Sequence, residues 1–214
     1  MGWFSWKGAA SSPASSPAPA PHLRELEAIR CCVTAWRRAV IEHWFQDGAD
    51  SREALSARLS ALSDYNRGWD GADPFTEQVL AIPVGGLEPS LLLEAHWRGE
   101  TAAAIAWALG LIPELPPPSQ GTDAAILDRW YPVGESSPGV VRAMREARLR
   151  DRAILTAKLA EWRQHLASAE AERERAGPAD REAAFAFSRA YERTRGLAWV
   201  LSDVSTIEDT PVDP

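Results

Sequence analysis

The sequence predicts an all-α fold, an irregular bundle of about six to eight helices around a central buried helix at residues 88–112. Apolar residues recur in steps of three and four along several long segments, a spacing typical of amphipathic helices. No stretch of useful length alternates apolar and polar residues as a half-buried strand does. Residues 101–112 are apolar on every side, which is expected only of a helix that its neighbours enclose.

Starts and ends of the other helices are marked by capping residues and prolines. An amphipathic helix of about six turns is expected after His22. Two more long helices are expected over 151–174 and 181–201, and residues 64–74 are rich in turn formers and predict a loop. The remaining helix starts carry an N-cap residue or a first-turn proline: Ser51, Pro74, Thr122 or Asp123, and Ser137–Pro138.

One domain is expected over residues 22–203, between two segments of different composition. Residues 1–21 combine an aromatic start with a Pro/Ala/Ser linker and are predicted to be disordered. Within them, Trp3, Phe4 and Trp6 suit a weak tether to a membrane interface or a partner. Residues 204–214 contain no basic residue and predict an acidic C-terminal tail.

The net charge and the two cysteines make some classes of function less favoured than others. The net charge is -7, which disfavours a nucleic-acid binder, and no apolar run is long enough for a transmembrane helix. Cys31 and Cys32 are neighbours on a predicted helix, where a disulfide between them would be strained. A reduced, cytoplasmic protein is the simplest interpretation. We expect no metal and no cofactor, because no ligand spacing and no phosphate loop is present.

No arrangement of catalytic residues stands out. His165 follows Glu161 by four residues on a predicted helix, and such a pair is more often a surface ion pair than a catalytic dyad. Partner binding is the alternative for polar or aromatic residues at loops and ends. The candidates for that role are Trp69, Asp70, Asp73, Trp130, Asp203, Glu208 and Asp209.

Three stretches carry a family resemblance. They are Trp97-Arg98-x-Glu100 with Trp107-Ala108-Leu109-Gly110, Glu114-Leu115-Pro116 and Asp123; Arg163-x-His165-x-Ala167; and Glu192-Arg193-x-x-Gly196-Leu197-x-Trp199-Val200 with Asp203-Val204-Ser205-Thr206 and Asp209-Thr210. Together they resemble the DUF4272 family, bacterial proteins that share a domain of unknown function. Thr122 stands where that family commonly has a cysteine, and Leu166 where it has an aromatic residue.

The resemblance implies a helical, cytosolic protein and brings no activity or cofactor with it. The polar residues of the three stretches have two interpretations. Placed at helix ends or edges, they can lock helices together through paired charge. Alternatively, they can form a site for a ligand or partner. These polar residues are Arg98, Glu100, Arg163, His165, Glu192 and Arg193.

Three functional hypotheses follow. The leading one is a non-catalytic protein that grips one protein partner, such as an immunity protein that neutralises a basic domain of a secreted toxin. The second is an enzyme or small-ligand-binding protein that uses Arg163, His165 and Glu192. The third is an adaptor of a secretion or envelope assembly, tethered by its aromatic N-terminus. The leading hypothesis assumes that the central helix is fully enclosed and lines no hollow with inward ionisable groups.

Overall fold

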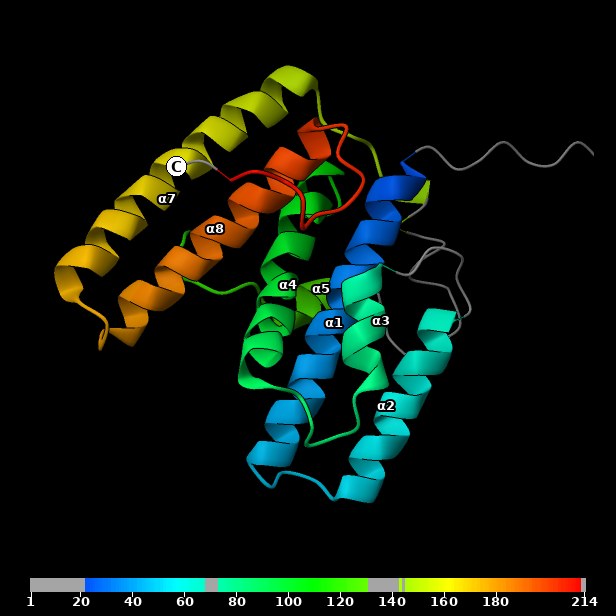
Figure 1. The fold of residues 1–214 in the computed structure, drawn as a ribbon. Helices are drawn as coiled ribbons and strands as arrows, with labels where there is room; N and C mark the ends of the chain where they lie inside the picture. The colour runs from blue at the N-terminus through cyan, green and yellow to red at the C-terminus, as the bar shows by residue number, and fades with distance from the viewer. Residues whose placement is uncertain (1–21, 68–72, 131–142, 144, 213–214) are drawn as a thin grey trace, which may run out of the picture.

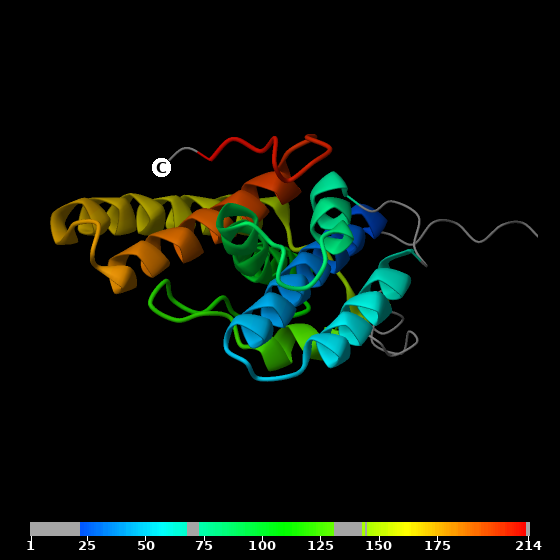
Figure 2. The ribbon, with the colours of Figure 1, turned by 60° about the horizontal axis from the view of Figure 1, so that its bottom comes forward.

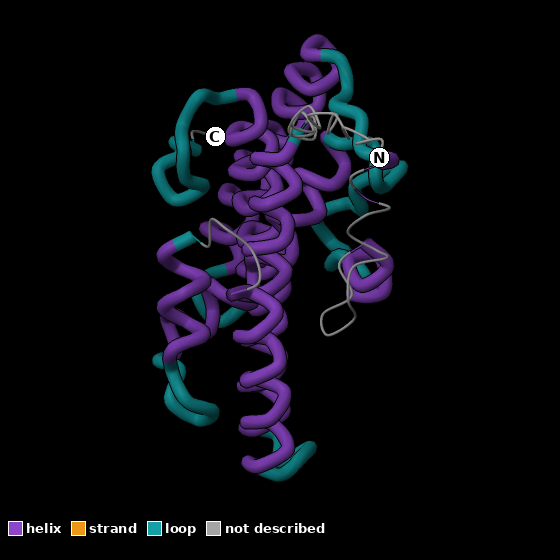
Figure 3. The backbone as a smooth tube through the Cα atoms, turned by 90° about the vertical axis from the view of Figure 1, so that its right-hand side faces the viewer, coloured by secondary structure: helices purple, strands orange, loops and turns teal. Residues whose placement is uncertain are grey.

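All the regular secondary structure in the described part of the chain is helical, which confirms the predicted fold class (Figures 1 and 3). The structure is a computed structural model and describes residues 22–67, 73–130, 143 and 145–212. The helix expected from Ser137–Pro138 lies outside these ranges. Seven helices are present within them: α1 Leu23–Gln46, α2 Arg52–Arg67, α3 Pro74–Ala81, α4 Pro89–Ala108, α5 Ala124–Trp130, α7 Arg152–Ala176 and α8 Arg181–Leu201.

Helix α4 is the centre of the bundle, as its composition predicts. It contacts α1, α5 and α8, and Figure 2 shows these elements around it. Every residue of Ala102–Ala108 is at most 5% exposed, including the indole of Trp107. Small alanine side chains allow the neighbouring helices to approach closely. The C-terminal half of α4 is therefore enclosed on all sides.

The central helix is shorter than expected, because it ends at Ala108 and not at Ile112. Gly110 adopts a left-handed conformation with φ +69°, which only glycine reaches without steric cost. The backbone N–H of Leu111 donates to the carbonyl of Ala106, and that of Gly110 to the carbonyl of Trp107. This is the Schellman arrangement that satisfies the last carbonyls of a helix.

The predicted loop at 64–74 is partly helical, since α2 continues through Arg67. Its last turn is anchored by Asn66, which is buried and accepts a hydrogen bond from Arg30 on α1. Ser51 caps α2 through a bond from the N–H of Ala54, as predicted. Asp73 caps α3 by accepting from the N–H groups of Phe75 and Thr76.

Helices α7 and α8 form an antiparallel pair along one side of α4 (Figure 1). The buried residues of α7 are Leu155, Leu159, Trp162, Leu166 and Ala169. The bounds of α8 match the expected range 181–201, and its buried face is partly charged. Glu192, Arg193 and Arg195 lie inside, whereas Phe187 and Tyr191 are only half-buried. Glu192 and Arg193 have partners on α4, and Arg195 pairs with Glu192, so each of the three buried charges is compensated.

The C-terminal segment packs onto the domain and does not form the expected tail. Ile207 is 7% exposed and joins the main hydrophobic core. Arg24 on α1 donates hydrogen bonds to the carbonyls of Trp199, Ser202 and Val204. Residues 202–212 are therefore held across the ends of α1 and α8 and belong to the folded unit.

Close contact between α4 and α8 depends on Gly196. A Cβ added there would lie 2.9 Å from the carbonyl oxygen of Thr101 and 3.0 Å from the Cβ of Ala104. Gly196→Ala should lower the free energy of unfolding by about 1–3 kcal/mol, although alanine is the better helix former. Chemical denaturation measures this.

Gly99→Ala is the matched control, because its added Cβ would meet the half-buried ring of Trp36 at 3.2 Å, not a backbone atom. The ring can yield, so the loss should be smaller. Equal losses for the two variants would contradict the assignment of Gly196 as the tight contact.

Candidate functional site

Four charged residues of the family motifs are buried on α4 and α8. Arg98 and Glu100 on α4, and Glu192 and Arg193 on α8, are each at most 7% exposed. They lie within the helices and are buried, which corrects the expectation that they occupy helix ends or edges. Buried charges need partners. Each of the four has one.

Glu100 and Arg193 form the ion pair that crosses from α4 to α8. Glu100 Oε2 lies 2.6 Å from Arg193 Nη2 and 2.9 Å from its Nε. Glu100 also accepts from the backbone N–H of Thr122 at 2.9 Å and from its hydroxyl at 2.7 Å. Arg193 donates further to the carbonyls of Pro116 and Gln120. Burial lowers the pKa of Arg193, and Glu100 opposes that shift.

Glu192 belongs to a second buried group. Its Oε2 lies 2.6 Å from the hydroxyl of Thr101 on α4 and 2.6 Å from Nη2 of Arg195. Burial raises the pKa of Glu192, while Arg195 and the Thr101 hydroxyl work in the opposite direction. These contacts hold α8 in register against α4.

Arg98 connects α4 to the C-terminal segment. Its Nη2 pairs with Glu94 at 3.0 Å and with Glu208, and its guanidinium lies 4.6 Å from the ring centre of Phe75. Burial alone would lower the pKa of Arg98. The negative charge that Cys32, Glu208, Glu192 and Glu94 can place around it outweighs burial and raises the pKa, so the cation is retained.

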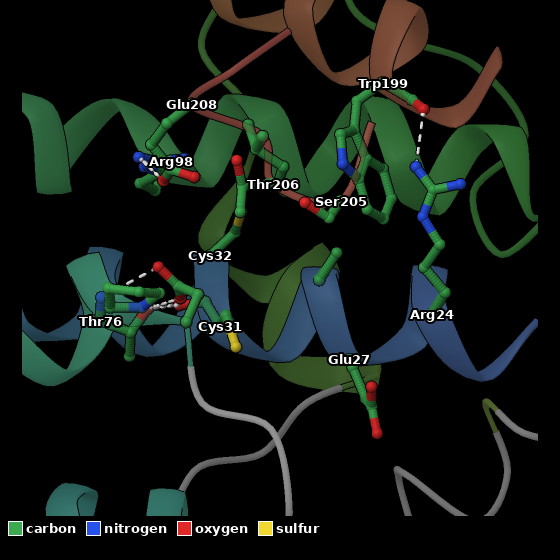
Figure 4. Close-up of a pocket in the computed structure, with 14 residues that line it drawn as sticks. Arg24, Glu27, Cys31, Cys32, Thr76, Arg98, Trp199, Ser205, Thr206 and Glu208 are labelled. Atoms are coloured by element: carbon green, nitrogen blue, oxygen red, sulfur yellow. Dashed lines mark hydrogen bonds and ion pairs between the residues drawn. The ribbon is translucent and has the colours of Figure 1, made fainter. Parts of the chain in front are cut away.

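Arg98 also lines a hollow of about 280 Å³ between α1, α3, α4, α8 and the C-terminal segment, which we call the Arg98 pocket. Figure 4 shows Arg98 and Glu208 at one end, Trp199 and Arg24 at the other, and Cys32 between them. This finding corrects the expectation that the central helix lines no hollow with ionisable groups. The lining also includes Glu27, Ala28, Cys31, Asp73, Pro74, Thr76, Ser205, Thr206 and Ile207.

A second hollow, of about 350 Å³, lies on another part of the surface between the end of α1, the start of α4 and α8. We call it the Leu93–Phe185 groove, lined by His43, Gln46, Pro89, Leu92, Leu93, His96, Trp97 and Phe185. Its aromatic rings are in edge contact, with centroids 5.4 Å apart for His43 and His96, and 5.5 Å for Trp97 and Phe185. Burial, reinforced by His43, lowers the pKa of His96, so its ring is neutral.

Arg163, His165 and Glu192 do not gather at one place. Arg163 is exposed on α7, and His165 is half-buried there with its Nε2 3.9 Å from Glu161 Oε1. Glu192 is buried against Thr101. Neither the Arg98 pocket nor the groove includes any of the three.

The candidate partner-binding residues have different positions. Asp203, Glu208 and Asp209 are exposed on the C-terminal segment, where Asp209 accepts a hydrogen bond from the Thr206 hydroxyl. Asp73 serves as the cap of α3. The others fall on residues whose side chains lie outside the described part: Trp69, Asp70, Trp130, and the tether residues Trp3, Phe4 and Trp6.

Several residues of these hollows were missed by sequence reasoning. The exposure of Leu93 could have been predicted. Leu91, Leu92 and Leu93 are consecutive on one helix and span about 200°, so they cannot all face the core. Arg24, Phe185 and Cys32 had no comparable sequence signal. Their roles depend on contacts with segments that are distant in the chain, such as the C-terminal segment beside α1.

Comparison with protein families identifies the segment that carries these features. A family model described as a domain of unknown function, DUF4272, matches residues 82–209. The chain belongs to the DUF4272 family. No curated protein and no solved structure matches it. The DUF4272 segment contains the Glu100–Arg193 pair and, from the Arg98 pocket, Arg98, Trp199 and Glu208; α1 and α3 precede it and supply the opposite wall.

Two features are absent from the described residues of this DUF4272 protein. No helix there combines the length and apolar character needed to cross a bilayer. No three His, Cys, Asp or Glu side chains there lie close enough together to hold a metal ion.

Removing Glu100 should be far more costly than removing a surface acid. Glu100→Ala leaves the buried Arg193 guanidinium without its counter-charge, and we expect a loss of about 3–5 kcal/mol in unfolding free energy. Glu172→Ala, which breaks an exposed pair with Arg175, should cost less than about 1 kcal/mol. Denaturant titration of both variants compares the two losses, and similar small losses would contradict the structural role of the pair.

Stability should also fall at alkaline pH because of the cysteines, which form no disulfide. Burial raises the pKa of Cys31 from 9.0 to about 11, and burial also raises the pKa of Cys32. Between pH 9 and about pH 11, the Cys31 thiol ionises in the unfolded chain but keeps its proton in the folded protein. The free energy of unfolding therefore falls as the pH rises.

Cys31→Ser removes one of these groups and should flatten the decline by about 2–3 kcal/mol between about pH 9 and 11. Urea unfolding of both proteins across this range measures the difference. Identical pH profiles would contradict the burial of the thiol.

Proposed function

We propose that this protein acts without catalysis, by binding one protein partner through the Leu93–Phe185 groove. The observation that supports this is the exposure of two large apolar side chains over one hollow. Leu93 on α4 is 55% exposed and Phe185 on α8 is 44% exposed, and both line the groove. Clustered apolar exposure of this kind is typical of interaction surfaces.

The groove has the composition of a binding hot spot. Trp97 is 8% exposed and contacts Phe185 edge to face, and the ring of His96 lies 5.0 Å from that of Trp97. Rings locked by such packing are pre-ordered, so a partner's apolar side chain can enter with little loss of side-chain entropy in this protein. The depressed pKa of His96 favours the neutral form of its ring at neutral pH.

The negative charge of this protein favours a basic binding partner. The chain carries a net charge of -7, and the groove is flanked by exposed Glu88, next to Pro89, and exposed Glu182, one turn before Phe185. Arg189 donates to the carbonyls of Pro118 and Ser119, and its guanidinium lies 5.8 Å from the ring centre of Phe185. Complementary charge speeds encounter and disfavours wrong partners. We therefore propose a cytoplasmic immunity protein that neutralises a basic toxin domain.

The purified product of the neighbouring gene is the partner to test. Leu93→Glu or Phe185→Glu places a charge in the groove and should weaken binding by roughly 30-fold or more, as expected for a hot-spot residue. Titration calorimetry gives the Kd, and circular dichroism checks that each variant is folded.

The matched control is Ile154→Glu, because Ile154 is also an exposed apolar residue, at 46%, but lies on α7 outside the groove. It should leave the Kd unchanged. A neighbouring product that does not bind, or that binds Leu93→Glu as tightly as the unmodified protein, contradicts the proposal.

A further inference from the structure

The Arg98 pocket contains buried hydrogen-bond donors without acceptors. Trp199 and Arg98 are each 2% exposed and both line the pocket. The indole Nε1 of Trp199 and the Nε of Arg98 have no hydrogen-bond partner. In Figure 4 the indole nitrogen lies on the side of the ring that faces the hollow, toward Thr206. Buried polar groups are normally paired, so two unpaired donors in one hollow indicate a missing acceptor.

The chemistry of these atoms specifies the kind of ligand. An indole N–H and a guanidinium N–H only donate, so a cation or an N–H donor cannot satisfy them. A guanidinium matches the geometry of an oxyanion and stays charged when buried beside carboxylates. The group that fits is therefore an oxygen acceptor with negative charge.

Surrounding charges favour a single negative charge. Asp73, Glu27 and Glu208 also line the pocket, and Glu94 already pairs with Arg98. A doubly charged phosphate would be repelled by these carboxylates. A ligand carboxylate that replaces the Glu208 carboxylate on Arg98 leaves the total charge around the guanidinium unchanged.

Glu208 is suited to such an exchange. Its side chain is 36% exposed and pairs with Arg98 over the pocket. The neighbouring Ile207 is buried in the core, and the Thr206 hydroxyl bonds Asp209, so the backbone of this segment is fixed. Only the Glu208 side chain has to rotate outward to open the cationic end of the pocket.

We propose that the Arg98 pocket binds a small organic acid, whose carboxylate takes the place of Glu208 on Arg98 and whose second oxygen, at the other end of the pocket, accepts from the Trp199 indole N–H. The apolar body of the ligand lies against Ala28, Ile207 and the Trp199 ring. The volume of about 280 Å³ limits it to a small molecule, just below the range of drug-sized sites. This site is separate from the Leu93–Phe185 groove, so each proposal can fail without the other.

Titration with butyrate, benzoate and 4-hydroxybenzoate tests the proposal, since only 4-hydroxybenzoate has the second oxygen, and benzamide is the uncharged counterpart of benzoate. Indole N–H signals in a proton–nitrogen NMR spectrum report on Trp199, which is assigned by its loss in Trp199→Phe. At least one carboxylate should shift this signal saturably, with a Kd of about 1 mM or tighter. Benzamide should not.

Two variants locate the binding. Glu208→Gln removes the competing carboxylate and should tighten carboxylate binding by about tenfold, because the ligand no longer has to displace a charge. Trp199→Phe keeps the ring, removes the donor and should weaken binding. Trp162→Phe is the matched control, since its Nε1 is equally buried and unpartnered but lies outside the pocket; it should have no effect.

Several outcomes overturn the inference. Failure of all three carboxylates, or equal affinity for benzamide, shows that the pocket is not an anion site. Saturable binding of inorganic phosphate without any carboxylate shows that the assigned class is wrong. Unchanged affinity in Glu208→Gln shows that Glu208 does not occupy the ligand position.

Discussion

The buried ion pair of Glu100 and Arg193 is the constraint on which the rest of the structure depends. Two charged groups in an apolar interior are stable only when each has its full set of partners. Arg193 donates to Glu100 and to three backbone carbonyls, and Glu100 accepts from Arg193 and Thr122. The contacts that pair these two charges therefore fix α4, α8 and the proline-rich connection at residues 116–122 relative to one another.

Close helix packing makes this pairing possible. Gly196 brings the backbone of α8 against Thr101, and the alanines of α4 add no bulk between the axes. The two interactions reinforce each other, because a wider separation would leave both the ion pair and the Thr101–Glu192 bond unmade. These polar contacts therefore favour a single packing arrangement of α4 and α8. Apolar contacts alone would be compatible with several arrangements of the same core.

The same helix separates the two hollows. Residues two apart on a helix point about 200° from one another, so Arg98 and Glu100 leave α4 on nearly opposite sides. Arg98 faces the pocket formed with α1, α3 and the C-terminal segment. Glu100 faces α8 and residues 116–122, on the side where Trp97, His96 and Phe185 continue into the Leu93–Phe185 groove. Burying both charges leaves a polar, donor-rich hollow on one side and an aromatic hollow on the other.

Sequence periodicity by itself determined the helices, most of their caps and the central place of α4. Those features are local, since apolar spacing, capping side chains and alanine content act within one helix or at its ends. The family motifs, and not periodicity, singled out Arg98, Glu100, Glu192 and Arg193 as a group. Their burial followed only from the partners that they find on other elements.

Tertiary structure alone decided the role of the C-terminal segment and both hollows. From the sequence alone, an acidic segment is predicted to be a solvated tail. In the structure Ile207 is buried in the core, and Glu208 pairs with Arg98, which lies 110 residues away in the chain. Arg24 acquires its role only when the carbonyls after α8 reach it. Contacts between residues so far apart in the chain produce no periodic sequence pattern. They depend on how the helices pack together and not on how each helix forms.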